Sequence, residues 1–166
     1  MKAVLMSIQP KWCELIASGK KTVEVRKTKP KLEVPFKVYI YETKDKRYEN
    51  VGVMGWKDDG TGYNFVNRCG KVIGEFVCDA MVVDRTYGHD DPLYRAACME
   101  AADIAAYCVN PKMYAWHISE LKIYDKPKEL SEFLVEDNRT FDCPQLVAMK
   151  RAPQSWCYVE GVRDNG

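Results

Sequence analysis

Residues 19–26 read Gly19-Lys20-Lys21-Thr22-Val23-Glu24-Val25-Arg26 and lie between a short apolar segment and a second basic run. Successive side chains of a β-strand point to opposite faces, so this stretch predicts a strand with Val23 and Val25 toward the core. Glu24 and Arg26 share the other face, with Lys20 and Lys21 at its entrance. A carboxylate, a guanidinium and ammonium groups on one small surface favour a polar or anionic ligand over an apolar one.

The segment before this strand has the pattern of a strand followed by a helix. Residues 3–8 predict the strand, and Pro10 begins the helix because its fixed φ and missing N–H are tolerated in a first helical turn. Gly19 stands at the expected C-terminal end. Trp12, Leu15 and Ile16 follow helical spacing and predict the buried stripe of this helix.

Residues 36–41 alternate in polarity and predict a further strand. One face carries Phe36, Val38 and Ile40, and the other carries Lys37 with Tyr39 and Tyr41. Three further strands are predicted, over residues 71–83 with a bend at Gly74, over 113–123 and over 154–160. One or two helices are predicted between an N-cap at Asp91 and residue 109, and a turn with a short helix at 127–133. Residues 135–152 are predicted to be irregular.

This order of elements predicts an α+β fold, a mixed and mostly antiparallel β-barrel of about six strands with two or three flanking helices. The length of 166 residues predicts a single domain over 1–166. Residues 42–70 contain five glycines and no clear periodicity, which predicts a long loop or hairpin insertion. Trp56 in that segment offers an apolar side chain for a partner protein.

Charge is distributed unevenly along a chain whose formal net charge is only +1. Residues 20–31 hold six cationic side chains and a single carboxylate, a local basic stripe that favours a phosphate-bearing ligand. A solvated strand and turn is the alternative interpretation of such a run. No segment has the ~20 apolar residues of a membrane span, and the first residues lack the features of a secretory signal, so we expect no membrane partner.

The seven cysteines form no C-x-x-C pair, and several stand in apolar surroundings. They predict buried free thiols in a reducing cytoplasm rather than disulfides or a zinc site. We therefore expect no metal and no cofactor. The segment His89-Asp90-Asp91 lies in a Gly/Pro turn, where helix capping is favoured over metal binding or acid–base chemistry.

Two further groups of residues are candidate parts of a binding site. Trp116 and His117 lie on opposite faces of a predicted strand, where Trp116 offers a ring for stacking on a nucleobase and His117 a hydrogen-bonding group or base. Core packing for Trp116 and a structural hydrogen bond for His117 are the alternatives. Near the C-terminus, Gln154 and Ser155 are candidates to line the mouth of a site together with Ser7 and Gln9.

The chain resembles the ASCH domain family, a branch of the PUA-like β-barrels, because Gly19, Lys21, Glu24 and Arg26 match the family signature G-x-K-x-x-E-x-R. Residues 7–10, 70–76 and 114–118 are similar to small bacterial and phage-borne members. The resemblance implies a cleft beside the signature strand and an association with RNA or nucleotides. One branch hydrolyses acetylcytidine with a Lys of this motif, a Thr three residues later and a distant Glu; here the Lys matches Lys21, whereas Glu24 stands at the Thr position. Some members are ribonucleases.

These observations lead to three hypotheses. The first is an RNA- or nucleotide-binding module, with Lys21, Glu24 and Arg26 in the cleft, Lys20 and Lys27 steering phosphates, and further contacts from the side chains Tyr39, Tyr41, Trp116, His117 and Ser155. The second is a small hydrolase of a modified nucleoside, or a ribonuclease, in which Lys21 and Glu24 are catalytic. The third is a protein-interaction domain that uses the 42–70 segment.

Overall fold

The computed structural model describes residues 2–47, 53–56, 63–84, 92–107, 113–137 and 145–160. Its helices are α1 (Pro10–Ala17), α2 (Pro92–Ala97) and α3 (Ala101–Tyr107), with a 3-10 turn η1 at Leu130–Glu132. Its strands are β1 (Lys2–Ile8), β2 (Val23–Arg26), β3 (Phe36–Glu42), β4 (Val53–Trp56), β5 (Tyr63–Val66), β6 (Val72–Cys78), β7 (Met81–Asp84), β8 (Met113–His117), β9 (Ser119–Lys128), β10 (Leu134–Asp137), β11 (Gln145–Ala148) and β12 (Trp156–Glu160).

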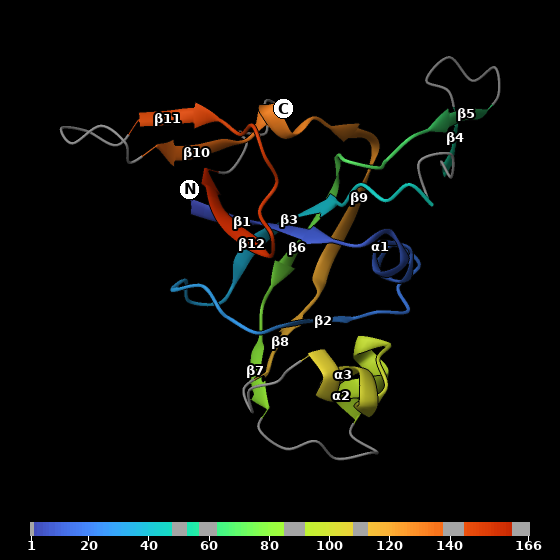
Figure 1. The fold of residues 1–166 in the computed structure, drawn as a ribbon, viewed down its shortest axis with the longest axis vertical. Helices are drawn as coiled ribbons and strands as arrows, with labels where there is room; N and C mark the ends of the chain where they lie inside the picture. Colours follow the sequence, from blue (N-terminus) through green and yellow to red (C-terminus); the bar gives the residue numbers. More distant parts are fainter. Residues whose placement is uncertain are drawn as a thin grey trace.

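The strands form a large sheet, a small sheet and a hairpin (Figure 1). The large sheet has the order β11-β10-β12-β1-β3-β6-β9, the small sheet has the order β2-β8-β7, and β4 pairs with β5 within the 42–70 segment. β1 runs parallel to β3 and antiparallel to β12, so the first strand of the chain lies beside the last. The fold is therefore mixed α+β and mostly strands, as predicted.

The predicted barrel is not confirmed. Within the described ranges, no strand pairing joins β11 to β9, the two edges of the large sheet, and the twelve strands exceed the predicted six. The strand predicted over 71–83 is two strands, β6 and β7, because the chain leaves the large sheet between them. The strand predicted over 113–123 is also two strands, β8 and β9, because the chain returns to the large sheet between them. The segment predicted to be irregular contains β10 and β11.

Two apolar cores cover the two faces of the large sheet. Phe36, Val38 and Ile40 of β3 belong to the first core, together with Trp116 and Ile16. Tyr39 and Tyr41, on the other face of β3, belong to the second core with Phe133. Because both faces of β3 are covered, its two tyrosines are 1% and 7% exposed.

The α1 helix begins at Pro10, and the chain leaves it through Gly19 at φ 71°, a left-handed conformation that favours glycine. Both boundaries agree with the prediction. The buried stripe differs, since Cys13 and Ile16 are buried whereas Trp12 and Leu15 are half-buried. Trp12 is thereby left partly available at the start of the helix.

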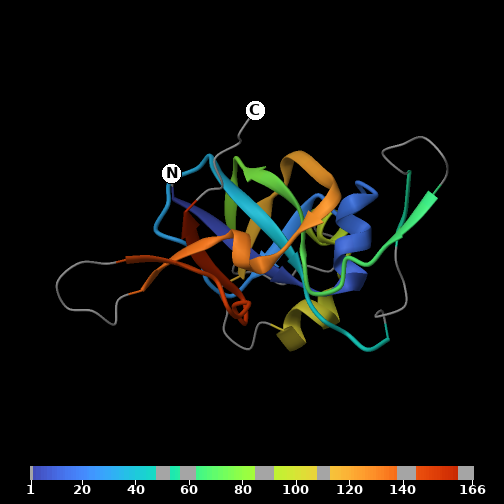
Figure 2. The same cartoon turned by 90° about the horizontal axis from the view of Figure 1, so that it is seen from above.

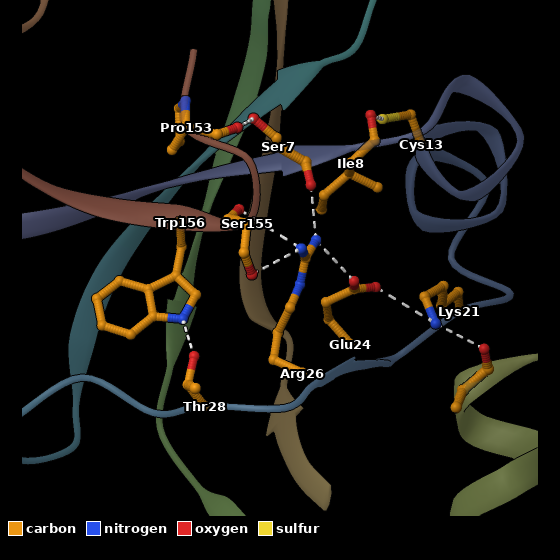
Figure 3. A network of polar contacts seen from close by, with 11 residues as sticks. Ser7, Ile8, Cys13, Lys21, Glu24, Arg26, Thr28, Pro153, Ser155 and Trp156 are labelled. Atoms are coloured by element: carbon orange, nitrogen blue, oxygen red, sulfur yellow. Dashed lines mark hydrogen bonds and ion pairs between the residues drawn. The ribbon is translucent and has the colours of Figure 1, made fainter. Parts of the chain in front are cut away.

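The β2 strand is covered on both faces, which positions the signature residues. Val23 and Val25 pack against Tyr94 and Ala97 of α2 in a third core. The opposite face, with Glu24 and Arg26, points toward β1 and the segment before β12 (Figure 3). All four residues of β2 are buried.

Candidate ligand-binding site

Lys21, Glu24 and Arg26 form a buried chain of charges, which we call the charged triad (Figure 3). The Lys21 ammonium lies 3.4 Å from Glu24 Oε2, and the Arg26 guanidinium lies 2.9 Å from Glu24 Oε1. Their side chains are only 1%, 8% and 8% exposed. A pair of this kind on an exposed strand was the alternative interpretation, and burial in the structure contradicts it.

The two ends of the triad are held by backbone carbonyls. Lys21 Nζ donates to Ala97 O at 2.6 Å, at the C-terminal end of α2, where a helix carries partial negative charge. Arg26 donates to Ser7 O at 2.7 Å and to Ser155 O and Oγ at 3.4 and 3.3 Å. The network thus ties β2 to α2, to β1 and to the segment that leads into β12.

A cavity of about 490 Å³ opens onto the triad, and we call it the first cavity. Its walls come from the end of β1, the start of α1, β2, α3 and residue 154. Besides the triad, its lining includes the polar or charged residues Ser7, Gln9, Lys11, Thr43, Asp103 and Gln154 and the aromatic residues Trp12 and Tyr107. Ser7, Gln9 and Gln154, which the sequence suggested as a mouth, do meet at one cavity.

Two polar atoms of the triad are buried and have no hydrogen bond to any described residue. They are Glu24 Oε2, which has only the ion pair with Lys21, and Arg26 Nε. Leaving buried polar atoms without partners costs about 1–3 kcal/mol each, so such atoms call for a structural or functional explanation. One is an acceptor and the other a donor, and both belong to residues that line the first cavity.

The basic residues around the triad divide into buried and exposed groups. Lys20 and Lys27 are exposed, as are Lys29 and Lys31. Lys27 Nζ lies 4.6 Å from the ring centre of Tyr107, a lining residue of the first cavity. Lys11 and Lys21 lie 4.7 and 5.0 Å from the ring centre of Trp12. Positive charge and aromatic rings therefore alternate around the opening.

Several predicted ligand-binding residues lie elsewhere. Trp116 is 0% exposed and packs edge-on against Phe36 with 5.5 Å between ring centres. Tyr39 and Tyr41 are in the second core. His117 is exposed and lies 2.6 Å from Asp79 Oδ1, and that hydrogen bond lowers the pKa of Asp79. Ser155, in contrast, adjoins the charged triad, because its hydroxyl group accepts a hydrogen bond from Arg26. His89, Asp90 and Asp91 lie outside the described residues.

Trp12, Tyr107 and Lys11 are cavity residues that the sequence interpretation missed. Trp12 was assigned to the buried stripe of α1, and the spacing of a stripe does not tell which side chain stands at its edge. Tyr107 ends α3, which reaches β2 only through tertiary packing. Lys11 follows Pro10 directly, and its place in the first turn of α1 beside the signature strand was a signal that could have found it.

The described part of the chain shows no group of three or more potential metal ligands. Burial raises the pKa of the Cys13 thiol well above 9.0 and those of Cys78 and Cys157 to about 11. These three cysteines are protonated at neutral pH, which makes them poor nucleophiles.

No described helix has the length and apolar character of a membrane span.

Glu75 of β6 pairs with Lys37 at 2.9 Å and accepts a hydrogen bond from Tyr124 at 2.5 Å. Burial raises the pKa of Glu75, but the two hydrogen bonds and the positive charges of Lys37 and Lys122 together lower it more, so the pKa lies below 4.5. A carboxyl group with a depressed pKa stabilises the fold above its unfolded pKa, and this contribution is lost as the pH falls through the folded pKa.

Glu75→Gln should therefore lower the free energy of unfolding by up to about 1 kcal/mol at pH 7, the size of a solvent-screened pair. The deficit should shrink as the pH falls below 4.5. Urea unfolding of both proteins across this range measures it, with Glu33→Gln, an exposed residue, as the matched control. A deficit that stays constant down to about pH 2 would contradict this account of Glu75.

Comparison with known proteins places these features in a family. The family model of the ASCH domain matches residues 6–128, which include the end of β1, the charged triad and the three described α-helices. The chain belongs to the ASCH domain family. This family is PUA-like and is thought to bind RNA. The resemblance that rested on the signature is thereby confirmed.

Solved ASCH structures share the fold at low sequence identity. The crystal structure of ASCH from Zymomonas mobilis superposes with a TM-score of 0.56 at 17% identity, covering 95% of this chain and 87% of that one. A tyrosine-to-phenylalanine mutant of the same protein gives a TM-score of 0.53 at 17% identity, covering 96% and 91%. At this identity the likeness concerns the fold alone. No curated protein matches this ASCH chain.

Proposed function

We propose that this ASCH domain binds single-stranded RNA and that the first cavity takes one nucleotide of it. The observation that carries the proposal is the buried charged triad, whose Glu24 Oε2 and Arg26 Nε lack hydrogen bonds beside a cavity of about 490 Å³. That volume lies in the range of small-molecule sites, roughly 300–1,000 Å³. Residues as far apart in the sequence as Ser7 and Gln154 line this one cavity, which supports the prediction of a single domain.

The chemistry of the opening suits a nucleotide. Nucleobases present hydrogen-bond donors and acceptors on their edges and a π-face for stacking. The Glu24 carboxylate accepts from a base N–H, the Arg26 guanidinium donates to a base oxygen or nitrogen, and Trp12 or Tyr107 stacks on the ring. Lys11, Lys20 and Lys27 attract the phosphates.

A hydrolase of a modified nucleoside is the second candidate, because Lys21 and Glu24 meet in the same cavity. Binding is favoured over catalysis by the contacts of Lys21. Its ammonium group is held by Ala97 O and by the Glu24 carboxylate, and an ammonium held in this way supplies charge rather than a lone pair for attack. The interaction hypothesis depends on Trp56, whose side chain lies outside the described residues.

The test is a calorimetric titration with ribonucleoside 5′-monophosphates, short single-stranded RNA and single-stranded DNA at two salt concentrations, with chromatography of the products. We expect RNA binding that weakens with salt and no product. Trp12→Ala, which removes a ring and no charge, should weaken binding roughly tenfold, the size of one lost stacking contact. Lys46→Ala, an exposed lysine outside the cavity, should leave binding unchanged.

The outcomes separate the candidates. Product formation that Lys21→Ala abolishes, with binding retained, would establish the hydrolase instead. Absence of binding to every RNA and nucleotide would overturn the proposed function. Equal losses for Trp12→Ala and Lys46→Ala would show that binding takes place outside the first cavity.

A further inference from the structure

A second cavity of about 640 Å³ lies between β12, the start of β1 and the hairpin formed by β10 and β11. The hairpin projects sideways from β12 in Figure 2, where these strands are orange and red. Among the described residues, β10 pairs with β12 at Leu134 and Glu160 alone, so the two strands diverge from this pair. The opening between them is lined mainly by apolar side chains, including Val135, Val147, Met149 and Tyr158.

The formal charges that line the second cavity balance, with Lys2, Lys150 and Arg151 against Glu136, Asp137 and Glu160. Lys2 pairs with Glu136 at 3.5 Å, and Asp137 and Glu160 also have interaction partners. Lys150 and Arg151 line the cavity and are exposed, and no ion pair or hydrogen bond joins either side chain to another described residue. An apolar cavity with two available cations favours a ligand that combines a planar apolar part with a phosphate.

The wall formed by residues 151–154 contributes to both cavities, although no single residue lines both. Gln154 lines the first cavity, whereas Arg151 and Pro153 line the second. Consecutive Cα atoms are about 3.8 Å apart, so the lining of one cavity passes into the lining of the other within one residue. Ser7 Oγ donates to Pro153 O at 2.6 Å, and Arg26 donates to Ser155, so the triad network fixes this wall (Figure 3).

We propose that the second cavity is a subsite for the neighbouring nucleotide of the same RNA strand. The strand crosses the wall at Gln154, one base enters the apolar opening beside Tyr158, and Lys150 with Arg151 holds the phosphate. This inference rests on the proposed function of the first cavity. It makes the ligand an oligonucleotide rather than a free nucleotide.

The test compares each ribonucleoside 5′-monophosphate with the matching homo-trinucleotide by calorimetry. The wild-type protein should bind the trinucleotide more tightly. Lys150→Ala/Arg151→Ala should weaken trinucleotide binding roughly tenfold and make the salt dependence shallower by about 0.7 logarithmic units per decade, the contribution of the one single-strand phosphate that the two side chains hold. Monophosphate binding should not change.

The matched control is Lys122→Ala/Lys126→Ala, which removes two exposed cations from β9 at the opposite edge of the large sheet. It should not change either affinity. Equal wild-type affinity for the monophosphate and the trinucleotide would overturn the subsite and leave the proposed function standing. An equal loss in both double variants would also overturn it, because the effect would then be general attraction of RNA. Absence of binding to both ligands would overturn both proposals.

Discussion

Glu24→Ala should lower the free energy of unfolding by about 3–5 kcal/mol, the cost of leaving buried charges without their partner. The carboxylate stands between Lys21 at 3.4 Å and Arg26 at 2.9 Å. Its removal leaves two cations with like charge in an environment where their side chains are 1% and 8% exposed. The loss is a large part of the roughly 5–15 kcal/mol that a typical domain has.

Urea unfolding at pH 7, followed by circular dichroism, measures this change. Glu14→Ala is the matched control, since Glu14 is an exposed glutamate on α1, and it should alter stability by less than about 0.5 kcal/mol. Similar small changes in both variants would mean that the triad is solvated in solution, and the argument from its burial would then fail.

Trp116→Ala should destabilise the fold by about 3–5 kcal/mol, as large-to-small substitutions of buried aromatic residues do. Trp116 is fully buried in the first core, edge-on to Phe36 and 6.1 Å from the ring centre of Trp156. Its truncation leaves a cavity among side chains that come from both sheets. The indole Nε1 has no hydrogen-bond partner, so the loss is one of packing alone.

Thermal and urea unfolding test this prediction, with Val82→Ala as the control because Val82 is 54% exposed on β7. The control should stay within about 0.5 kcal/mol of the wild type. If Trp116→Ala instead weakened RNA binding while stability stayed near the wild-type value, Trp116 would be a base-stacking residue as the sequence suggested.

The elements next to the signature were the ones that sequence could predict. Pro10, Gly19 and the alternation of residues 36–41 are local signals, and the structure has α1 and β3 where they indicate. The transfers of the chain between sheets were missed. Between β6 and β7 the chain has Asp79 and Ala80, with no glycine or proline to mark the change of sheet. At the start of β9, Glu120 has φ 47°, a conformation that non-glycine residues adopt uncommonly.

Burial of the charged triad could not be predicted from the strand pattern. Alternation tells which side chains share a face but not whether a second layer covers that face. The residues that hold Arg26, the partner of Glu24, are Ser7 and Ser155, which are far apart in the sequence. Burial of Tyr39 could not be predicted for the same reason, since only tertiary structure brings Phe133 over its face of β3.

The pairing of β1 with β12 bears on how the protein is made. A ribosome releases β1 and β2 early, yet the edge of β1 and the anchor of Arg26 are completed only by residues 155–160. During synthesis, the central strand of the large sheet and the charged triad therefore lack these partners until residues 155–160 have been made. Such long-range contacts slow folding and leave an open strand edge that invites aggregation. The nascent chain is thus incapable of holding RNA in the proposed manner until β12 has emerged.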